Sequence, residues 1–428
     1  MKKTLIYTDG LNAVNSNKFY TLTLEGDSVV ASYGRVGTSP QTRSYSGGQR
    51  KFDSIIREKL AKGYTEALLT DTVVQTVSSS KVNLSSIAKS QIKGSYGDLV
   101  DRLSEMNVHN ILEGTAITIN KDSGLFQTPL GIITSEAIQQ AHDLLDKIST
   151  LFLNNSSSDT FNLDKMTSQY LRVVPKNIGV TRPLFRNIFS SQDILSKEYS
   201  ILESLKGSVE AISVQSNVKD SEVNTPVLWT TILDLVTDLE ILKYVESKYN
   251  STRQSRHSCY NMQVKSVYKV SLPEKSKSYL SMIFKYLEDT KQTKLKSPEV
   301  LELWHGSAGS NILSILKSGL QCSPPTTAKI AGKLFGPGTY FSDQSTKSLG
   351  YASGYWSGQK TKSAFMFIQD VFMGNIYYPR STGSCINMTK QGYHSIWAQP
   401  KYVTSLLNNE MIVYNTDQID YKYLIEFE

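Results

Sequence analysis

Cysteine is scarce in this sequence, and its three copies lie far apart. Cys259, Cys322 and Cys385 are odd in number and show none of the paired spacing of a zinc site or a disulfide framework. We therefore predict that the protein holds no metal and works in a reducing compartment inside the cell.

Long hydrophobic runs are also missing. The apolar stretch Leu5-Ile6-Tyr7 is cut off at Asp9, which is too short for the core of a signal peptide. No later segment approaches the roughly 18 consecutive apolar residues that a membrane-spanning helix needs. The sequence predicts a soluble protein with no membrane partner.

Charge of neither sign dominates. The 428 residues include 46 basic and 39 acidic ones, which gives a net charge of +7. A moderate basic excess fits a polyanionic partner and a merely soluble basic protein equally well. The hydrophobic content of 39% is typical of globular proteins. The length allows two or three domains.

Residues 1–72 alternate apolar and polar side chains in short runs. The runs 19–24 and 28–33 flank the turn residues 25–27, a pattern typical of a β-hairpin. From Phe52 to Leu60 apolar residues recur at helical spacing. We predict a small domain made of a sheet and one helix.

Two changes in composition and in the spacing of apolar residues occur in the middle of the chain. Residues 73–95 are rich in Ser, Thr, Val and Lys without a clear period, which indicates a linker. Residues 96–215 show mainly helical spacing, with a stripe from Ile138 to Ile148 behind Thr134, a predicted N-cap. This region is predicted to be an all-α bundle.

Strand-like segments rich in aromatic and β-branched residues take over in residues 216–428, for example at 262–268 and 411–414. This last region is predicted to be mainly β. The expected fold class is therefore α+β, divided among several domains.

A set of short motifs in the last region carries the chemistry. Leu303–Ser307 is predicted to be a strand that runs into a tight turn, and a short helix that ends at Gly319 follows it. Phe335–Asp343, Lys347–Tyr351 and Asn408–Tyr414 come later in the chain. These motifs resemble, in order and spacing, the His, Tyr and Glu motifs of the poly(ADP-ribose) polymerase catalytic domain.

The resemblance extends over most of the chain. Residues 129–131, Pro-Leu-Gly before a helix, and later Tyr170 to Pro175 with Gly179, look like the helical regulatory domain that precedes the catalytic domain in DNA-dependent members. Residues 17–20 and 33–37 look like the WGR domain, which those members use near DNA ends. The implied order is a WGR-like DNA-binding domain at 1–72, a linker at 73–95, a helical regulatory and autoinhibitory domain at 96–215 and a catalytic domain at 216–428.

The resemblance implies an NAD⁺-dependent ADP-ribosyltransferase. Glu410 would stabilise the positive charge that develops on the ribose as the nicotinamide bond breaks. His305 would hold the adenosine ribose, and Tyr340 would close one side of the nicotinamide site. Gly306, Ser307 and Ser348 would contact the nicotinamide end, Tyr351 would stack on its ring, and Lys347 would lie near Glu410.

DNA ends or breaks and protein acceptors, including the chain itself, are the implied partners, and an accessory protein could complete the acceptor site. The protein would lie in the nucleus of a eukaryote, or in the cytoplasm or nucleoid of a bacterial or viral system. The expected DNA contacts are basic residues of the first domain with one aromatic ring, namely Lys18, Tyr33, Arg35, Arg43, Arg50 and Lys51.

The sequence departs from the family pattern at two positions. Gln321 stands where an Arg often follows Gly-Leu, and Tyr33 stands where the WGR motif has Trp. Three alternatives to a DNA-stimulated polymerase stay open at this point. They are a mono-ADP-ribosyltransferase, a catalytically weak DNA-binding protein with a relic fold, and a nucleic-acid phosphotransferase, although the sequence has no cluster of basic catalytic residues for the last.

Overall fold

The computed structural model describes the chain except for residues 10–15, 68–83, 120–124, 129–130, 155–158, 177–187, 190, 217–226, 323–333 and 355–362. Pro129, Leu130 and Gly179 of the expected regulatory motifs therefore lie outside the described residues. The chain divides into two compact units. The first contains residues 1–84 and 108–225, and the second contains residues 85–107 and 226–428.

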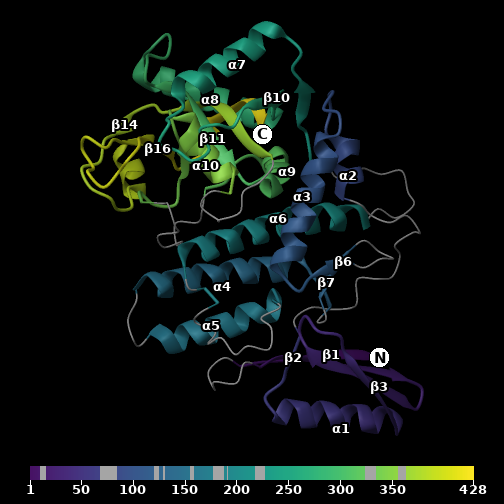
Figure 1. The fold of residues 1–428 in the computed structure, drawn as a ribbon. Coiled ribbons are helices and arrows are strands. Elements are labelled where there is room, and N and C mark those ends of the chain that lie inside the picture. Colours follow the sequence, from purple (N-terminus) through teal and green to yellow (C-terminus); the bar gives the residue numbers. More distant parts are fainter. Residues whose placement is uncertain are drawn as a thin grey trace. The chain divides into compact units, whose positions relative to one another are not determined.

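A five-stranded antiparallel sheet opens the first unit, and one helix covers it (Figure 1). The predicted hairpin is confirmed, because β2 pairs with β3 from Lys18 opposite Arg35 to Glu25 opposite Ser28. The predicted helix is confirmed as well, and it buries Phe52, although Leu60 stays exposed. The elements are β1 (Lys2–Asp9), β2 (Ser16–Glu25), β3 (Ser28–Arg35), β4 (Gln41–Ser46), α1 (Gly48–Ala61) and β5 (Thr65–Glu66).

Three long helices form the rest of the first unit together with the end of a fourth. Thr134 caps α4, as predicted, because its hydroxyl accepts a hydrogen bond from the amide of Ala137 at 3.2 Å. A small three-stranded sheet, which the sequence pattern did not indicate, joins the helices. The elements are α3 (Leu99–Gly114), β6 (Thr118–Ile119), β7 (Phe126–Thr128), β8 (Gly131–Ile132), α4 (Ser135–Asn154), α5 (Asp159–Val173) and α6 (Gln192–Ser216).

The second unit begins inside the segment that was expected to be a linker. Helix α2 (Leu84–Gln91) lies there, and the backbone of 93–95 then pairs with β9. Gly94 makes this pairing possible, because it has φ of 110° and a Cβ atom would lie 2.3 Å from the carbonyl oxygen of Leu233. The described part of the predicted linker, residues 84–95, therefore contains a helix and a short strand pairing.

Two sheets dominate the second unit, in agreement with the mainly β prediction. A five-stranded sheet has the order β11-β13-β17-β10-β9, and a four-stranded sheet has the order β12-β16-β15-β14. Strand β13 is buried along nearly its whole length, so the core follows it. The strands are β9 (Ile232–Leu235), β10 (Val264–Ser271), β11 (Val300–Ser307), β12 (Thr339–Phe341), β13 (Ala364–Phe372), β14 (Ile376–Tyr377), β15 (Ser395–Ala398), β16 (Glu410–Val413) and β17 (Ile419–Phe427).

Four helices and two 3₁₀ turns accompany these sheets. They are α7 (Leu239–Thr252), α8 (Pro273–Thr290), α9 (Gly309–Ser318), α10 (Ser345–Ala352), η2 (Ile386–Gln391) and η3 (Thr416–Gln418). Helix α9 ends at Gly319, as predicted. In the described part of the chain, no helix combines the length and the apolar character that crossing a membrane would require.

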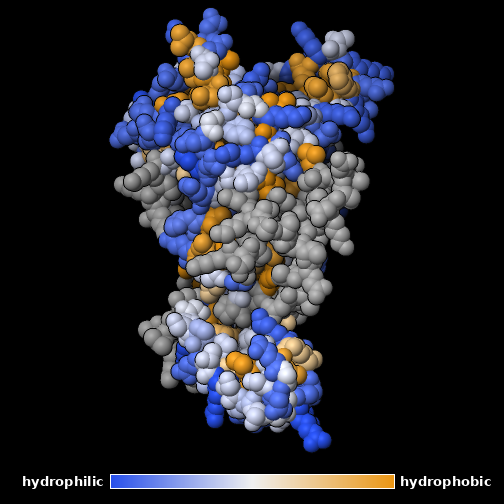
Figure 2. Space-filling model, turned by 90° about the vertical axis from the view of Figure 1, so that its right-hand side faces the viewer, coloured by the Kyte–Doolittle hydropathy of each residue, from blue (hydrophilic) through white to orange (hydrophobic). Residues whose placement is uncertain are grey.

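The surface mixes polar and apolar residues. Figure 2 shows separate hydrophobic groups on a mainly hydrophilic face. Exposed apolar side chains include Leu280 and Phe284 on α8 and Leu239 on α7. Small groups of exposed apolar residues of this kind are common on protein surfaces and by themselves assign no function.

Candidate active site

Strand β11 brings His305 to the place where the two sheets of the second unit meet. The amides and carbonyls of Trp304 and Ser342 exchange hydrogen bonds of 2.9 and 3.1 Å, which joins β11 to the end of β12. His305 Nδ1 lies 2.9 Å from the carbonyl oxygen of Tyr340. Because a carbonyl oxygen can only accept, Nδ1 carries the proton of this bond. Two of the predicted site residues are therefore in direct contact.

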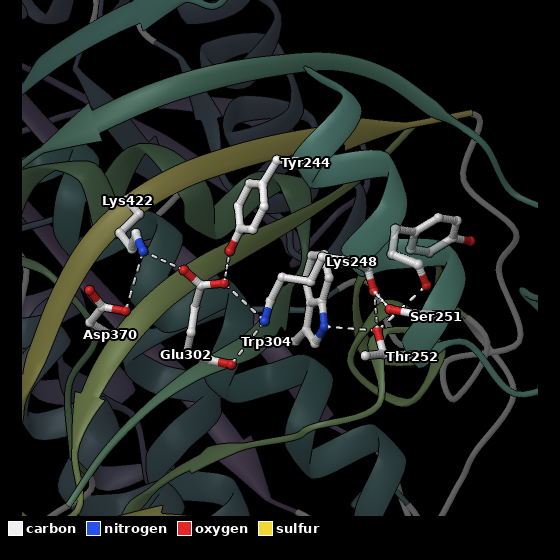
Figure 3. A network of polar contacts seen from close by, with 9 residues as sticks. Tyr244, Lys248, Ser251, Thr252, Glu302, Trp304, Asp370 and Lys422 are labelled. Carbon is white, nitrogen blue, oxygen red and sulfur yellow. Dashed lines mark hydrogen bonds and ion pairs between the residues drawn. The ribbon is translucent and has the colours of Figure 1, made fainter. Parts of the chain in front are cut away.

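A polar network fixes β11 against α7 (Figure 3). The Glu302 carboxylate forms an ion pair of 2.9 Å with the Lys248 ammonium and also contacts Tyr244 and Lys422. The fully buried Trp304 donates its indole N–H to Thr252 Oγ1 at 3.1 Å. These contacts leave β11 little freedom to shift, so His305 keeps its position.

Gly306 follows His305 and lies directly against α10. A Cβ atom at this position would lie 1.9 Å from the carbonyl oxygen of Ser348, so only glycine allows the strand and the helix to approach this closely. The buried Ser348 hydroxyl donates to the carbonyl oxygen of Trp304 at 3.1 Å. Its oxygen can still accept a hydrogen bond from an amide. Ser307 completes the strand.

Glu410 and Lys347 form an ion pair in the same region. Lys347 Nζ lies 2.7 Å from Glu410 Oε2 and donates to the carbonyl oxygen of Asn409, also at 2.7 Å. The two side chains are only 9% and 14% exposed. Burial raises the pKa of Glu410, an effect that the Lys347 ammonium opposes, and burial lowers the pKa of Lys347.

Strand pairing brings the predicted tyrosine next to this ion pair. Strand β16, which starts at Glu410, pairs with β12 and places Ile412 opposite Tyr340. The Tyr340 hydroxyl donates to the carbonyl oxygen of Gly336 and accepts from the amide of Phe335, each at 2.9 Å. Tyr351 on α10 is 49% exposed, which leaves ring surface for a ligand to contact.

Asp343 supports the site, although the sequence analysis assigned it no role. Its Oδ2 accepts from Asn409 Nδ2 at 2.7 Å, and its Oδ1 is buried with no hydrogen-bond partner among the described residues. The Asp343 charge also raises the pKa of Glu410, after burial. The position of Asp343 inside the 335–343 motif was the only feature of the sequence that pointed to it.

Arg256 is a second residue that the sequence analysis missed. Its Nη2 donates to Gln344 Oε1 at 3.3 Å, to the carbonyl oxygen of Leu407 at 3.1 Å and to Asn408 Oδ1. Arg256 thus ties the start of α10 to the loop that leads into Glu410. No local pattern marks such a long-range contact.

The predicted DNA contacts lie on the first sheet and its helix. Lys18 and Arg35 are directly opposite each other on β2 and β3. Arg43 and Lys51 lie over the Tyr45 ring, at 5.1 and 5.2 Å from its centroid, and Arg50 is exposed on α1. Alternation along the paired strands puts Lys18, Arg35 and Arg43 on the sheet face that α1 covers.

The ring of Tyr33, unlike the predicted basic contacts, packs against other aromatic and apolar side chains of the first domain. Its ring stacks on Tyr20, with centroids 5.2 Å apart and planes 15° apart, and it packs against the core of the domain. One face of Tyr33 is therefore already in contact with protein. Stacking of this ring on DNA remains a prediction.

Three family models match successive parts of the chain. The WGR domain model matches residues 1–70, the poly(ADP-ribose) polymerase regulatory domain model matches 109–228, and the poly(ADP-ribose) polymerase catalytic domain model matches 240–406. The catalytic match includes His305 and Tyr340. It ends before Glu410, so the role of Glu410 stays a prediction.

Relatives with low identity cover most of the chain. Poly [ADP-ribose] polymerase 1 of Danio rerio is 25% identical over 98% of this chain and 45% of its own length. Poly [ADP-ribose] polymerase 2-B of Oryza sativa subsp. japonica is 25% identical over 96% of this chain and 69% of its own length. Poly [ADP-ribose] polymerase of Drosophila melanogaster is 26% identical over 70% of this chain and 31% of its own length. The chain thus spans less than half the length of two of these three relatives.

Proposed function

Because this chain belongs to the poly(ADP-ribose) polymerase family, we propose that it transfers ADP-ribose from NAD⁺ to protein acceptors, the chain itself included. The observation that carries this proposal is the buried Lys347–Glu410 ion pair. Strand β16, which begins at Glu410, pairs with the strand of Tyr340, and His305 on β11 contacts the Tyr340 carbonyl oxygen. A carboxylate held in a site of low polarity stabilises positive charge far better than one in water.

The reaction replaces one bond at the ribose C1′ carbon. The bond from C1′ to the nicotinamide nitrogen breaks, its electron pair neutralises the pyridinium ring, and neutral nicotinamide leaves. The acceptor oxygen then forms a bond to C1′ and loses its proton. Glu410 stabilises the oxocarbenium-like transition state and orients the incoming hydroxyl. When that hydroxyl belongs to an ADP-ribose unit already attached, the chain grows.

The surrounding residues position NAD⁺. His305 contacts the adenosine ribose, while Gly306, Ser307 and Ser348 contact the carboxamide of nicotinamide. Tyr351 offers its exposed ring surface to the nicotinamide ring, and Tyr340 covers the opposite side. Holding the dinucleotide in one pose lowers the entropy cost of reaching the transition state.

We also propose that broken DNA stimulates the reaction through the basic face of the first sheet. Lys18 and Arg35 lie side by side there, and Arg43 lies on the same face. Such cations neutralise phosphates without regard to base sequence, as recognition of a DNA end requires. The protein would then act inside the cell, in the nucleus or the nucleoid. None of the similarities described above points to an accessory protein, so the proposal does not include one.

The decisive experiment is incubation with labelled NAD⁺, with and without duplex DNA that carries breaks, followed by sizing of the protein-bound product. We expect long polymers whose yield rises with DNA. Single ADP-ribose units would instead support the mono-ADP-ribosyltransferase alternative. Release of no nicotinamide under either condition would contradict the proposal.

A further inference from the structure

The segment between Asp370 and Glu410 contains no acidic residue. It carries the cations Arg380, Lys390 and Lys401 and several aromatic side chains. The segment includes β14, η2 and β15, and β14 lies in the yellow lobe at the left of Figure 1. Cations and aromatic residues without acidic residues between them are typical of surfaces that bind strands of nucleotides.

Two ring contacts join the residues after β14 to those around β15. Tyr378 stacks on Trp397, with centroids 6.1 Å apart and planes 29° apart. Two residues further along, the Arg380 guanidinium lies 4.3 Å from the centre of the Tyr402 ring. Lys401 Nζ lies 4.5 Å from the centre of the same ring. We call these five residues the Tyr378–Tyr402 patch.

The two cations of the patch remain available to an anion. Within the described part of the chain, neither Arg380 nor Lys401 forms an ion pair with a carboxylate. Both are exposed, and their contacts with the Tyr402 ring restrict their positions without neutralising their charge. Restricting a cation before it binds reduces the entropy that binding costs.

Tyr378 supplies a surface on which a base can stack. It remains 40% exposed although it stacks on Trp397. Its ring is thus supported by protein and still open to solvent. Such supported rings bind unpaired bases of any identity, because every base has a flat aromatic face.

We propose that the Tyr378–Tyr402 patch binds an unpaired strand of nucleotides, with a base on Tyr378 and phosphates on Arg380 and Lys401. This binding site is additional to NAD⁺ binding and to the DNA contacts of the first sheet. Single-stranded nucleic acid and ADP-ribose polymer share the required chemistry, phosphates that alternate with stackable bases. A base-paired duplex has no free bases along its length, and an acidic peptide has none at all.

The test measures binding of the full-length protein to two fluorescent ligands by anisotropy at several salt concentrations. One ligand is an oligo(dA) strand of about 12 nucleotides, a length within the site size of single-strand-binding proteins. The other is an ADP-ribose polymer. The central variant is Arg380→Ala combined with Lys401→Ala. Lys390→Ala is the matched control, because Lys390 is an exposed cation of the same acid-free segment that contacts no ring in the described structure.

The double variant should bind at least one of the two ligands about tenfold more weakly or worse. The slope of log K against log salt should fall by about 1.4, which corresponds to the removal of two phosphate contacts on a single strand. Tyr378→Ala should weaken binding while Tyr378→Phe retains it. Lys390→Ala should change the affinity much less than the double variant, and the thermal unfolding of each variant is measured to establish that it is folded.

Three results would overturn the proposal. One is that the folded double variant binds both ligands with the affinity and salt slope of the wild type. Another is that neither ligand binds the wild-type protein. The third is that polyglutamate displaces the bound strand as effectively as unlabelled oligo(dA), because the patch would then recognise negative charge alone.

Discussion

Glu410 and Lys347 depend on each other because both side chains are nearly buried. Each charge compensates the other, and removal of either side chain leaves an uncompensated charge in a site of low polarity. Asp343 and Arg256 then hold the loop that leads into Glu410, through Asn409 and Asn408. Contacts from Asp343 and Arg256 thus position the loop that leads into the Glu410 carboxylate.

Replacement of Glu410 by Gln should remove most of the activity and little of the NAD⁺ affinity. The side chain keeps its shape but loses the charge that stabilises the ribose in the transition state. We expect a loss of about 2 to 4 kcal/mol in transition-state stabilisation, read from kcat/KM. Glu288→Gln, which changes an exposed Glu of α8, is the control. Polymer synthesis at the wild-type rate by the Glu410 variant would rule out this role.

The pH profile of kcat should have its acid limb above the pH at which an exposed glutamate titrates. Burial and the Asp343 charge raise the Glu410 pKa, and the active form is the ionised one, so activity falls as pH drops through that raised pKa. Asp343→Asn retains an oxygen that can accept from Asn409 and removes the charge. Its acid limb should therefore move to lower pH, and an acid limb that stays in place would exclude this influence of Asp343.

At the scale of elements, the β2–β3 hairpin sets the spacing of the cations that we propose contact DNA. Lys18 and Arg35 are neighbours only because the strands pair in this register. Arg35→Ala should weaken binding to DNA ends and reduce the slope of log K against log salt by about 0.9 for each phosphate that the arginine neutralises. Lys62→Ala is the matched control, because Lys62, the residue that follows α1, already pairs with Glu58 at 2.6 Å. If the two substitutions change the DNA affinity and its salt slope equally, Arg35 does not contact DNA.

Helix α3 is fastened to the catalytic sheet by a buried ion pair. Arg102 donates to both carboxylate oxygens of Glu426 on β17, at 2.6 and 2.9 Å, and the Glu426 side chain is fully buried. Burial alone would raise the pKa of Glu426, but the hydrogen bonds and charges of Arg102 and then Lys265 outweigh it and lower that pKa. The pair therefore stabilises the fold above the pKa that Glu426 has in the unfolded chain. This stabilisation is lost as the pH falls through the lower pKa of the folded state.

Arg102→Ala should lower the free energy of unfolding by about 3 kcal/mol at neutral pH, because it leaves Glu426 buried with only Lys265 nearby. Asp98→Asn removes the exposed partner of the same arginine and should cost less than about 1 kcal/mol. Arg102→Met combined with Glu426→Leu should recover much of the loss. Urea unfolding monitored by tryptophan fluorescence measures all three. A loss for Arg102→Ala no larger than that for Asp98→Asn would contradict this account.

At the scale of the whole molecule, the division into compact units falls within α3. Residues 85–107 belong with the catalytic sheets, and only from Val108 does the chain belong with the helical region. The regulatory-domain model also begins at residue 109. Deletion from residue 96, the boundary expected from the helical pattern, would remove Arg102 and also Asn107, which donates a hydrogen bond to the carbonyl oxygen of Ser310.

Deletion of residues 108–225, with a flexible linker in their place, should give an enzyme that is active without DNA. The proposed reason is that the helical region favours a closed state and that DNA shifts the balance toward an open one. Deletion of 96–215 should instead give an unstable protein, because Glu426 loses its partner. Polymer yield with and without broken DNA, together with thermal unfolding, separates the two deletions. A stable 108–225 deletion that still requires DNA would refute autoinhibition.

Local chemistry allowed many elements to be predicted from the sequence. The hairpin at 16–35, the cap at Thr134 and the end of α9 at Gly319 depend on interactions among residues close together in the chain. The motifs around His305 and Tyr340 were visible for the same reason, since each is a short run with fixed spacing.

The contacts that complete the site join residues far apart in the sequence. Lys347 meets Glu410, Arg256 meets Asn408 and Arg102 meets Glu426, and no local period or motif encodes any of these pairs. The polar composition of 84–95 indicated a linker, yet α2 and the pairing with β9 form there. Tertiary packing stabilises these elements where the local sequence preference is too weak to do so. The sequence by itself determined many of the elements, the family resemblance and the candidate site residues. Only the tertiary structure decided which distant charges share a buried site, because burial and pairing of charges are properties of the assembled fold.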